Sequence, residues 1–206
     1  MATVHPIRQT PEDEQPFELH AAAMDNLRFI RETMERAGSF TAMSGWGTVV
    51  MGVTALAAAW VASRQASPEA WLVVWWAEAL FAIGIGGWTT ARKARAAKMP
   101  LLSGPGRKFA LSLAPPLVAG ALLTAFLYDT GLFAALPGVW LLLFGTGVVT
   151  AGAFSVKVVP VMGMCFMALG TAALFTPAGW GDAMMALGFG GLNVLFGAII
   201  AWRHGG

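Results

Sequence analysis

The sequence predicts an all-α, polytopic membrane protein, in which a six-transmembrane-helix bundle follows an N-terminal cytoplasmic amphipathic helix. Of the 206 residues, 57% are hydrophobic and only 12% are charged, and the mean hydropathy is +0.65. Soluble domains carry about 25% charged residues. After residue 40 the charged residues fall almost entirely between long apolar runs, and a spanning helix needs about 20 apolar residues. A soluble core is excluded because it would lack the polar surface to cover such runs.

The chain before the first predicted span has two parts. Residues 1–16 are acidic and Pro-rich, and we expect them to be disordered. Residues 17–40 predict an amphipathic helix, because one apolar stripe recurs at spacings of three and four. This helix lies on the membrane surface or against the bundle, or it pairs two protomers as a coiled coil; two heptads are too few to prefer pairing. The stripe consists of Ala23, Leu27, Ile30, Met34 and Ala37.

Six apolar segments follow within residues 41–202. We expect the spans at about residues 41–63, 70–90, 109–128, 133–154, 158–175 and 183–202, and a short C-terminus at 203–206. Only one charge, Lys157, separates the fourth span from the fifth. We place a tight hairpin at Ser155-Val156-Lys157, because Pro160 can open the next helix without needing its missing N–H.

The basic residues predict the orientation of the spans. Twelve of the 13 lysines and arginines fall on one side, and Arg64 alone falls on the other. Basic loops stay in the cytoplasm, so we expect both termini in the cytoplasm and the protein in the inner (plasma) membrane. Tryptophans at both predicted ends of the spans are typical of interfacial aromatic belts. They are Trp46, Trp88 and Trp202 on the inner side and Trp60, Trp71 and Trp180 on the outer side.

The predicted loop at residues 91–108 carries six basic residues and no acidic one. It sets the topology, attracts anionic lipid at about 1 kcal/mol per basic residue, or docks an acidic protein, and the sequence does not separate these interpretations. No nucleic-acid partner is expected, because the basic residues are an orientation signal. A homo-oligomer remains an alternative through the stripe of residues 17–40.

Glycines predict which helices pack most closely. Four spans contain two glycines seven residues apart, which places both on one helix face. Small residues on such a face let two backbones approach, and close contact drives helix association in lipid. We therefore expect the first, fourth, fifth and sixth spans to pack tightly. The pairs are Gly45 with Gly52, Gly145 with Gly152, Gly163 with Gly170, and Gly190 with Gly197.

Glu78 is the main candidate for a functional residue, because it lies inside the apolar stretch Trp71–Trp88. An ionisable group at bilayer depth is costly and is usually kept for a partner or a function. Either Glu78 is a proton-coupled carboxyl or cation ligand facing a cavity, or it is protonated and bonded to a neighbouring helix, which we favour. Trp75 and Trp76, one turn earlier, line a pocket or face lipid. The expected partners of Glu78 are Asn193, Thr54, Thr146 and Thr150.

Other chemistry finds little support in the sequence. All three histidines lie outside the predicted spans, so a membrane haem held by two histidines, or a histidine–carboxylate metal site, is not expected. The single cysteine, Cys165, is expected to be a small buried apolar residue. No catalytic residue, metal or cofactor is assigned. Asp129 and Asp182 are expected to be solvated ends of helices.

Two classes of function follow from these patterns. The first is a non-catalytic membrane component, a sensor, regulator or assembly partner that acts through helix packing and its cytoplasmic helix. The second is a small transporter or channel-like protein that uses Glu78 for proton or cation coupling. We favour the first class, because the spans contain few polar groups. An enzyme ranks third, because nucleophile–base pairs are missing from the spans.

Overall fold

The computed structural model describes residues 24–29, 44–96, 104–153 and 155–204, and the chain divides into two units, Met1–Gly38 and Ser39–Gly206. In the first unit, residues 24–29 are helical and exposed. The other residues of the predicted tail at 1–16 and of the amphipathic helix at 17–40 lie outside the described residues. That helix, with its stripe, therefore stays a prediction.

The second unit contains six helices that are long and apolar enough to cross a membrane. The sixth is composite, because a seven-residue π-helix, η3, interrupts it. Within the described residues the second unit contains no strand, so the predicted all-α chain with six apolar helices is confirmed. These helices suggest a multi-pass membrane protein. They are α2 (Gly45–Ala62), α3 (Pro68–Ala96), α4 (Gly104–Asp129), α5 (Leu136–Gly152), α6 (Val158–Phe175), and α7 (Gly181–Met185) continuing through η3 (Ala186–Leu192) into α8 (Asn193–His204).

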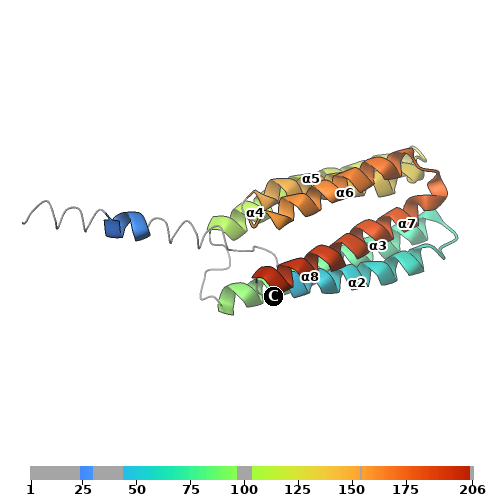
Figure 1. The fold of residues 1–206 in the computed structure, drawn as a ribbon. Helices are drawn as coiled ribbons and strands as arrows, with labels where there is room; N and C mark the ends of the chain where they lie inside the picture. The colour runs from blue at the N-terminus through green and yellow to red at the C-terminus, as the bar shows by residue number, and fades with distance from the viewer. Residues whose placement is uncertain (1–23, 30–43, 97–103, 154, 205–206) are drawn as a thin grey trace, which may run out of the picture. The chain divides into compact units, whose positions relative to one another are not determined.

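The helices form two layers (Figure 1). One layer holds α4, α5 and α6, and the other holds α2, α3, α7 and α8. Helix α5 packs mainly against α6 and α4, whereas α2 packs mainly against α8 and α3. The turn between α5 and α6 falls at the predicted hairpin, since α5 ends at Gly152 and α6 begins at Val158. Short 3-10 turns, η1 (Phe133–Ala135) and η2 (Ala178–Trp180), lead into α5 and α7.

Helices α5 and α6 touch through their backbones. A Cβ atom added at Gly145 would lie 2.7 Å from the carbonyl oxygen of Gly163, and one added at Gly163 would lie 2.7 Å from that of Gly145. The same close approach recurs seven residues along each helix, where a Cβ at Gly138 would lie 3.0 Å from the carbonyl oxygen of Gly170. These helices can therefore pack at this distance only with glycine at the contact.

The second close pair joins the first span to the last. A Cβ at Gly52 would lie 2.7 Å from the backbone nitrogen of Val194, and one at Gly197 would lie 2.7 Å from that of Val49. Gly45 faces the backbone of Ala201. The predicted tight packing of four glycine-bearing helices is thus confirmed, but it occurs as two separate pairs, one in each layer.

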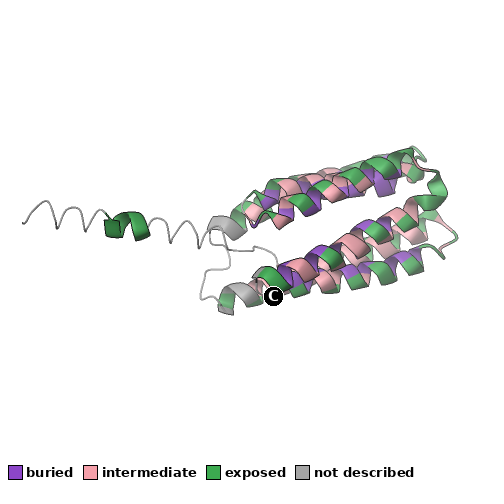
Figure 2. Ribbon diagram, viewed as in Figure 1, coloured by how far each residue is buried: buried purple, intermediate pink, exposed green. Residues whose placement is uncertain are grey.

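Aromatic side chains connect the two layers. Phe144 of α5 packs on Phe166 of α6 and on Phe189 of η3, with ring centroids 4.8 and 5.1 Å apart. Phe189 in turn lies 6.1 Å from Trp75 of α3. Buried residues of the facing helices, among them Leu141 of α5, belong to the same core cluster. Figure 2 shows that both layers contain buried residues.

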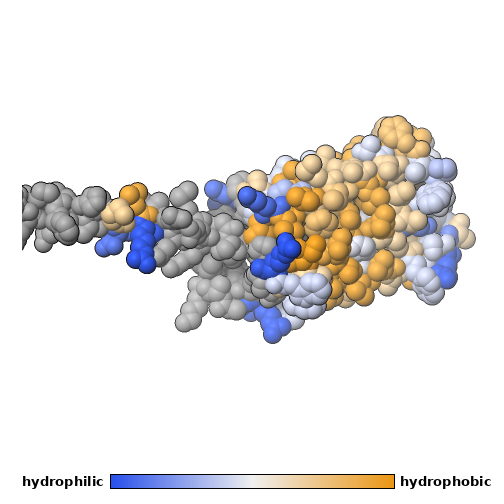
Figure 3. Space-filling model, viewed as in Figure 1, coloured by the Kyte–Doolittle hydropathy of each residue, from blue (hydrophilic) through white to orange (hydrophobic). Residues whose placement is uncertain are grey.

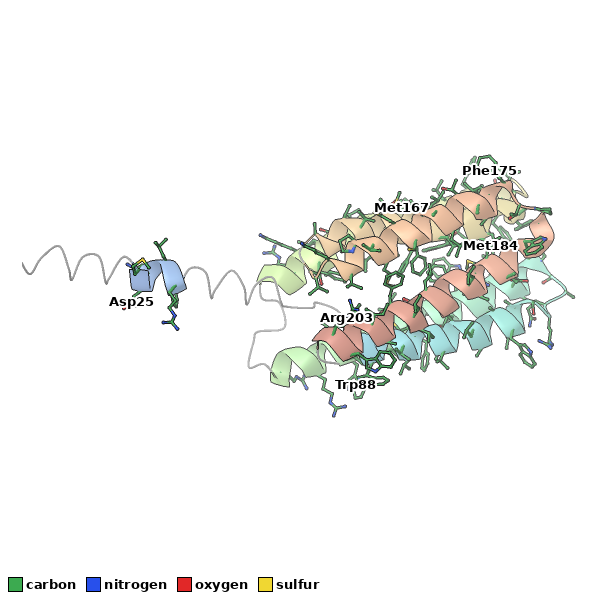
Figure 4. All side chains as sticks on the ribbon, viewed as in Figure 1. Asp25, Trp88, Met167, Phe175, Met184 and Arg203 are labelled. Atoms are coloured by element: carbon green, nitrogen blue, oxygen red, sulfur yellow. The ribbon has the colours of Figure 1, made fainter. Side chains whose placement is uncertain are left out.

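The two ends of the bundle differ in charge. At one end, the termini of α5, α6 and α8 meet in a cluster of Val148, Val156, Val159 and Ile200. This basic end carries the described basic residues Arg92, Arg95, Arg107, Lys108, Lys157 and Arg203. The opposite, acidic end carries Glu69, Asp129 and Asp182 together with Arg64. Figure 4 shows Arg203 and Trp88 toward the basic end and Phe175 toward the other.

Between these ends the surface is apolar. The space-filling view shows a hydrophobic band over the helices with hydrophilic residues beyond both of its ends (Figure 3). Five of the six tryptophans predicted at the ends of spans are exposed: Trp46, Trp60, Trp88, Trp180 and Trp202. A band of this kind with tryptophans at its edges is typical of a protein surrounded by lipid.

The close contact of α5 and α6 leads to a first prediction. Replacing Gly163 by Ala forces its new methyl group against the α5 backbone, and overpacking of this kind lowers the free energy of unfolding by about 1–3 kcal/mol. Unfolding of the purified protein in a detergent series measures the change. The matched control is Gly84→Ala, because no atom lies within 4 Å of that position. Equal stability of the two variants would contradict the assigned contact.

Candidate functional site

Glu78 lies on α3 and bonds to the neighbouring helix α2. The hydroxyl of Thr54 lies 2.8 Å from Oε1 of Glu78 and 2.9 Å from the carbonyl oxygen of Met51. That hydroxyl has one hydrogen, so it donates to only one of the two at a time. Glu78 is half-buried. One side chain from each helix thus makes a polar link across the α2–α3 contact.

The other three predicted partners bond elsewhere. Thr146 donates to the carbonyl oxygen of Leu142 at 2.9 Å, and Thr150 lies 3.0 Å from that of Thr146. The Asn193 side chain donates to the carbonyl oxygen of Phe189 at 2.8 Å. In helices these short polar side chains can bond the carbonyl one turn earlier, and in hydrocarbon no water competes for it. Of the four expected partners, only Thr54 is bonded to Glu78.

Asn193 supports an irregular part of its own helix. It is buried and directly follows the π-helix Ala186–Leu192, where the regular i to i−4 bonding is interrupted. Its backbone N–H donates to Gly190, three residues earlier, while its side chain donates to Phe189. The only amide within the predicted spans therefore satisfies a backbone carbonyl of the π-helix. Segments of this kind are often found at functional sites.

A groove lies between α3 and α4, and no pattern in the sequence predicted it. It has a volume of about 720 Å³ and an apolar floor. Glu78 is not among its lining residues, because the lining residues of α3 recur at spacings of three and four on another face of that helix. That spacing, visible in the sequence, could have indicated which face of α3 lines a groove, but it could not indicate that α4 forms the opposite wall. From α3 come Glu69, Leu72, Val73, Trp76, Ala77 and Leu80, and from α4 come Ala121, Thr124, Ala125, Tyr128 and Asp129.

The mouth of the groove lies at the acidic end. The hydroxyl of Tyr128 donates to Oε1 of Glu69 at 3.0 Å and so joins α4 to α3. Asp129 follows Tyr128 in the lining. The groove therefore combines an apolar body with two carboxylates at one end.

One aromatic residue, Trp76, lines the body of the groove, and Trp140 supports it from behind. Trp76 contacts Trp140 of α5 edge to face, with centroids 6.2 Å apart. The Trp140 indole N–H donates to the hydroxyl of Thr124 at 2.9 Å, and that hydroxyl lies 2.8 Å from the carbonyl oxygen of Gly120. Trp76 lines the groove and is 41% exposed, so both interpretations left open for it, a pocket wall and a ring facing lipid, stay predictions.

Asp182 differs from its expected role. It was expected to be a solvated end of a helix, but its Oδ1 accepts a 2.6 Å hydrogen bond from the indole N–H of Trp71. This bond joins α7 to α3 at the acidic end. Trp71 is accordingly half-buried, unlike the other five tryptophans predicted at the ends of spans. Asp129, by contrast, is an exposed end of a helix that also lines the groove.

The chain matches no protein-family model, no curated protein and no solved structure.

The Glu78–Thr54 bond can be measured by a double-mutant cycle that combines Thr54→Val with Glu78→Met. Hydrogen bonds between membrane helices average about 0.6 kcal/mol and reach about 1.7 kcal/mol, so we expect a coupling free energy in that range. The readout is the free energy of unfolding in mixed micelles.

The control cycle pairs Glu78→Met with Thr146→Val, because Thr146 bonds its own helix. The changes in unfolding free energy caused by substitutions at two sites without contact add within about 0.3–0.5 kcal/mol. A coupling for Thr54 no larger than that of the control would refute the bond.

Proposed function

We propose that this protein is a non-catalytic membrane component, a sensor, regulator or assembly partner that works through helix packing. One observation carries the proposal: the Glu78 carboxyl group bonds to Thr54 at the α2–α3 contact, and Glu78 is not among the residues that line the groove. A carboxyl used for ion coupling needs a polar path, whereas a bonded carboxyl between packed helices holds those helices together.

Two exposed surfaces support a role in assembly. In the apolar window of α3 only 6% of residues are buried inside the protein, against 44% for α2. An apolar helix with so little of its surface covered presents a long face to lipid or to another helix. In the first unit, Leu27 of the predicted stripe is 61% exposed, which suits a helix that binds a membrane surface, a partner or a second copy.

A transporter using Glu78 is the second candidate. The half-buried state of Glu78 within an apolar helix favours it, because a carboxyl at that depth is costly unless it has a use. Asn193 no longer supports this candidate, since its amide is bonded to Phe189.

A flux assay separates the two candidates. We expect liposomes that contain the protein to dissipate a pH gradient no faster than empty liposomes, and Glu78→Gln to behave in the same way, because the groove does not reach this carboxyl. A pH-sensitive dye inside the liposomes measures the rate. Flux above that of empty liposomes would overturn the proposal. Its loss in Glu78→Gln, but not in the control Glu69→Gln, would assign coupling to Glu78.

We further propose that the protein lies in the inner membrane with its basic end and both termini in the cytoplasm. The charge asymmetry of the two ends supports this orientation, because basic residues are retained on the cytoplasmic side. The described basic residues of the predicted loop at 91–108 lie near the end of α3 and the start of α4. They are Arg92, Arg95, Arg107 and Lys108. They suit anionic lipid head groups, or an acidic protein, at that surface.

Cysteine labelling tests this orientation. In a Cys165→Ala background, we expect a membrane-impermeant maleimide to label Gln65→Cys on intact cells and to label Arg95→Cys only after lysis. Gln65 lies between α2 and α3, and Arg95 lies near the end of α3 at the basic end. The opposite pattern of labelling would reverse the topology.

A further inference from the structure

We propose that the groove between α3 and α4 binds a single-chain amphiphile with a positively charged ammonium head. This inference rests on the proposed function and deepens it by naming what a sensor of this kind would bind. The apolar lining receives the alkyl chain, and the carboxylates of Glu69 and Asp129 receive the head group at the mouth.

The size and lining of the groove suit a small molecule. Ligand sites usually have volumes of about 300–1,000 Å³ and apolar walls with a few placed polar groups. This groove has about 720 Å³ and is open at the surface of the protein instead of enclosed. Its floor is formed by side chains such as Leu72, Val73 and Leu80 on α3 and by Ala121 and Ala125 on α4. An alkyl chain lying there contacts apolar side chains along its length.

The charge at the mouth selects the head group. No lysine, arginine or histidine is among the lining residues, whereas two lining residues, Glu69 and Asp129, carry carboxylates. Arg64 is the one described basic residue of the acidic end, and it is not among the lining residues. Its guanidinium carbon lies 3.6 Å from the ring centroid of Trp60. An alkyl chain gains little by leaving lipid for an apolar groove, because lipid tails are equally apolar. Any preference of the groove for one amphiphile over the surrounding lipids therefore has to come from the head group of that amphiphile.

The Tyr128–Glu69 bond argues against a transmembrane helix as the occupant. It ties α4 to α3 across the mouth, so a helix lying along the whole groove would meet this link. None of the lining residues is glycine, in contrast to the glycine contacts where helices of this protein pack closely. An amphiphile avoids both obstacles, because its chain lies below the link and its head lies beside it.

The test uses the full-length protein in dodecyl maltoside micelles, which contain no ammonium group. The probe is a hexadecylammonium that carries a nitroxide, and electron paramagnetic resonance measures the immobilised fraction. The comparison probe is a hexadecyl phosphate with the same label. We expect saturable immobilisation of the ammonium probe and none of the phosphate probe. Equal immobilisation of both probes, or of neither, would overturn the proposal.

Three variants locate the site. Glu69→Gln combined with Asp129→Asn should weaken binding about tenfold, because each exposed charge pair contributes only modestly to affinity. Ala125→Phe should abolish binding by filling the groove while leaving both carboxylates. The matched control, Asp182→Asn, removes one charge from the same end but keeps an acceptor for Trp71, and it should bind as the wild type does. Unchanged binding in Ala125→Phe, or equal loss in Asp182→Asn, would overturn the assignment.

Two further outcomes concern other occupants. Displacement of the probe by phosphatidylethanolamine but not by hexadecyltrimethylammonium would overturn the single-chain cationic class. A disulfide-linked dimer formed through Val73→Cys in a Cys165→Ala background, with loss of probe binding, would overturn the proposal in favour of a second copy. These binding results are separate from the proton-flux result, so each proposal can fail on its own.

Discussion

The bundle depends on contact between helix backbones at glycine. In lipid there is no gain from hiding apolar side chains from water, so helices associate by close packing and by hydrogen bonds across the contact. Gly145 against Gly163, and Gly52 against Val194, allow that packing in the two layers. A methyl group at either contact would collide with a backbone atom, which a side-chain rotation cannot relieve. The remaining helices, α3 and α4, attach to these two pairs from outside.

This arrangement explains where the polar groups lie. Within the tight pairs, Thr146 and Asn193 bond carbonyl groups of their own helices and leave the helix–helix surface smooth. Polar links between helices occur where the packing is looser, at Thr54 with Glu78 and at Tyr128 with Glu69. The aromatic cluster around Phe144 and Phe189 joins the two layers through ring contacts. The α3–α4 groove lies outside these contacts, where both walls are peripheral helices.

Local features of the sequence predicted much of the fold and part of the site. Runs of about 20 apolar residues identify spans because the bilayer sets their length, and glycine spacing identified the closely packed faces. The sequence narrowed the partners of Glu78 to four but could not choose Thr54, because depth along a helix does not tell which face meets which neighbour. The groove and the Trp71–Asp182 bond were missed for the same reason. The π-helix was missed because its residues, ALGFGGL, equally suit an α-helix.

The pairing of α2 with α8 has a consequence for biosynthesis. The chain is made from its N-terminus, and helices α5 and α6, which are neighbours in sequence, can pack as soon as both have entered the bilayer. The glycine face of α2, however, packs on α8, which is made only after α3 to α7. Until α8 has entered the bilayer, this face of α2 lacks the backbone contact that it makes in the folded protein. A chain truncated before residue 193 would lack α8, and the part of α2 that packs on α8 would be exposed to other helices in the membrane.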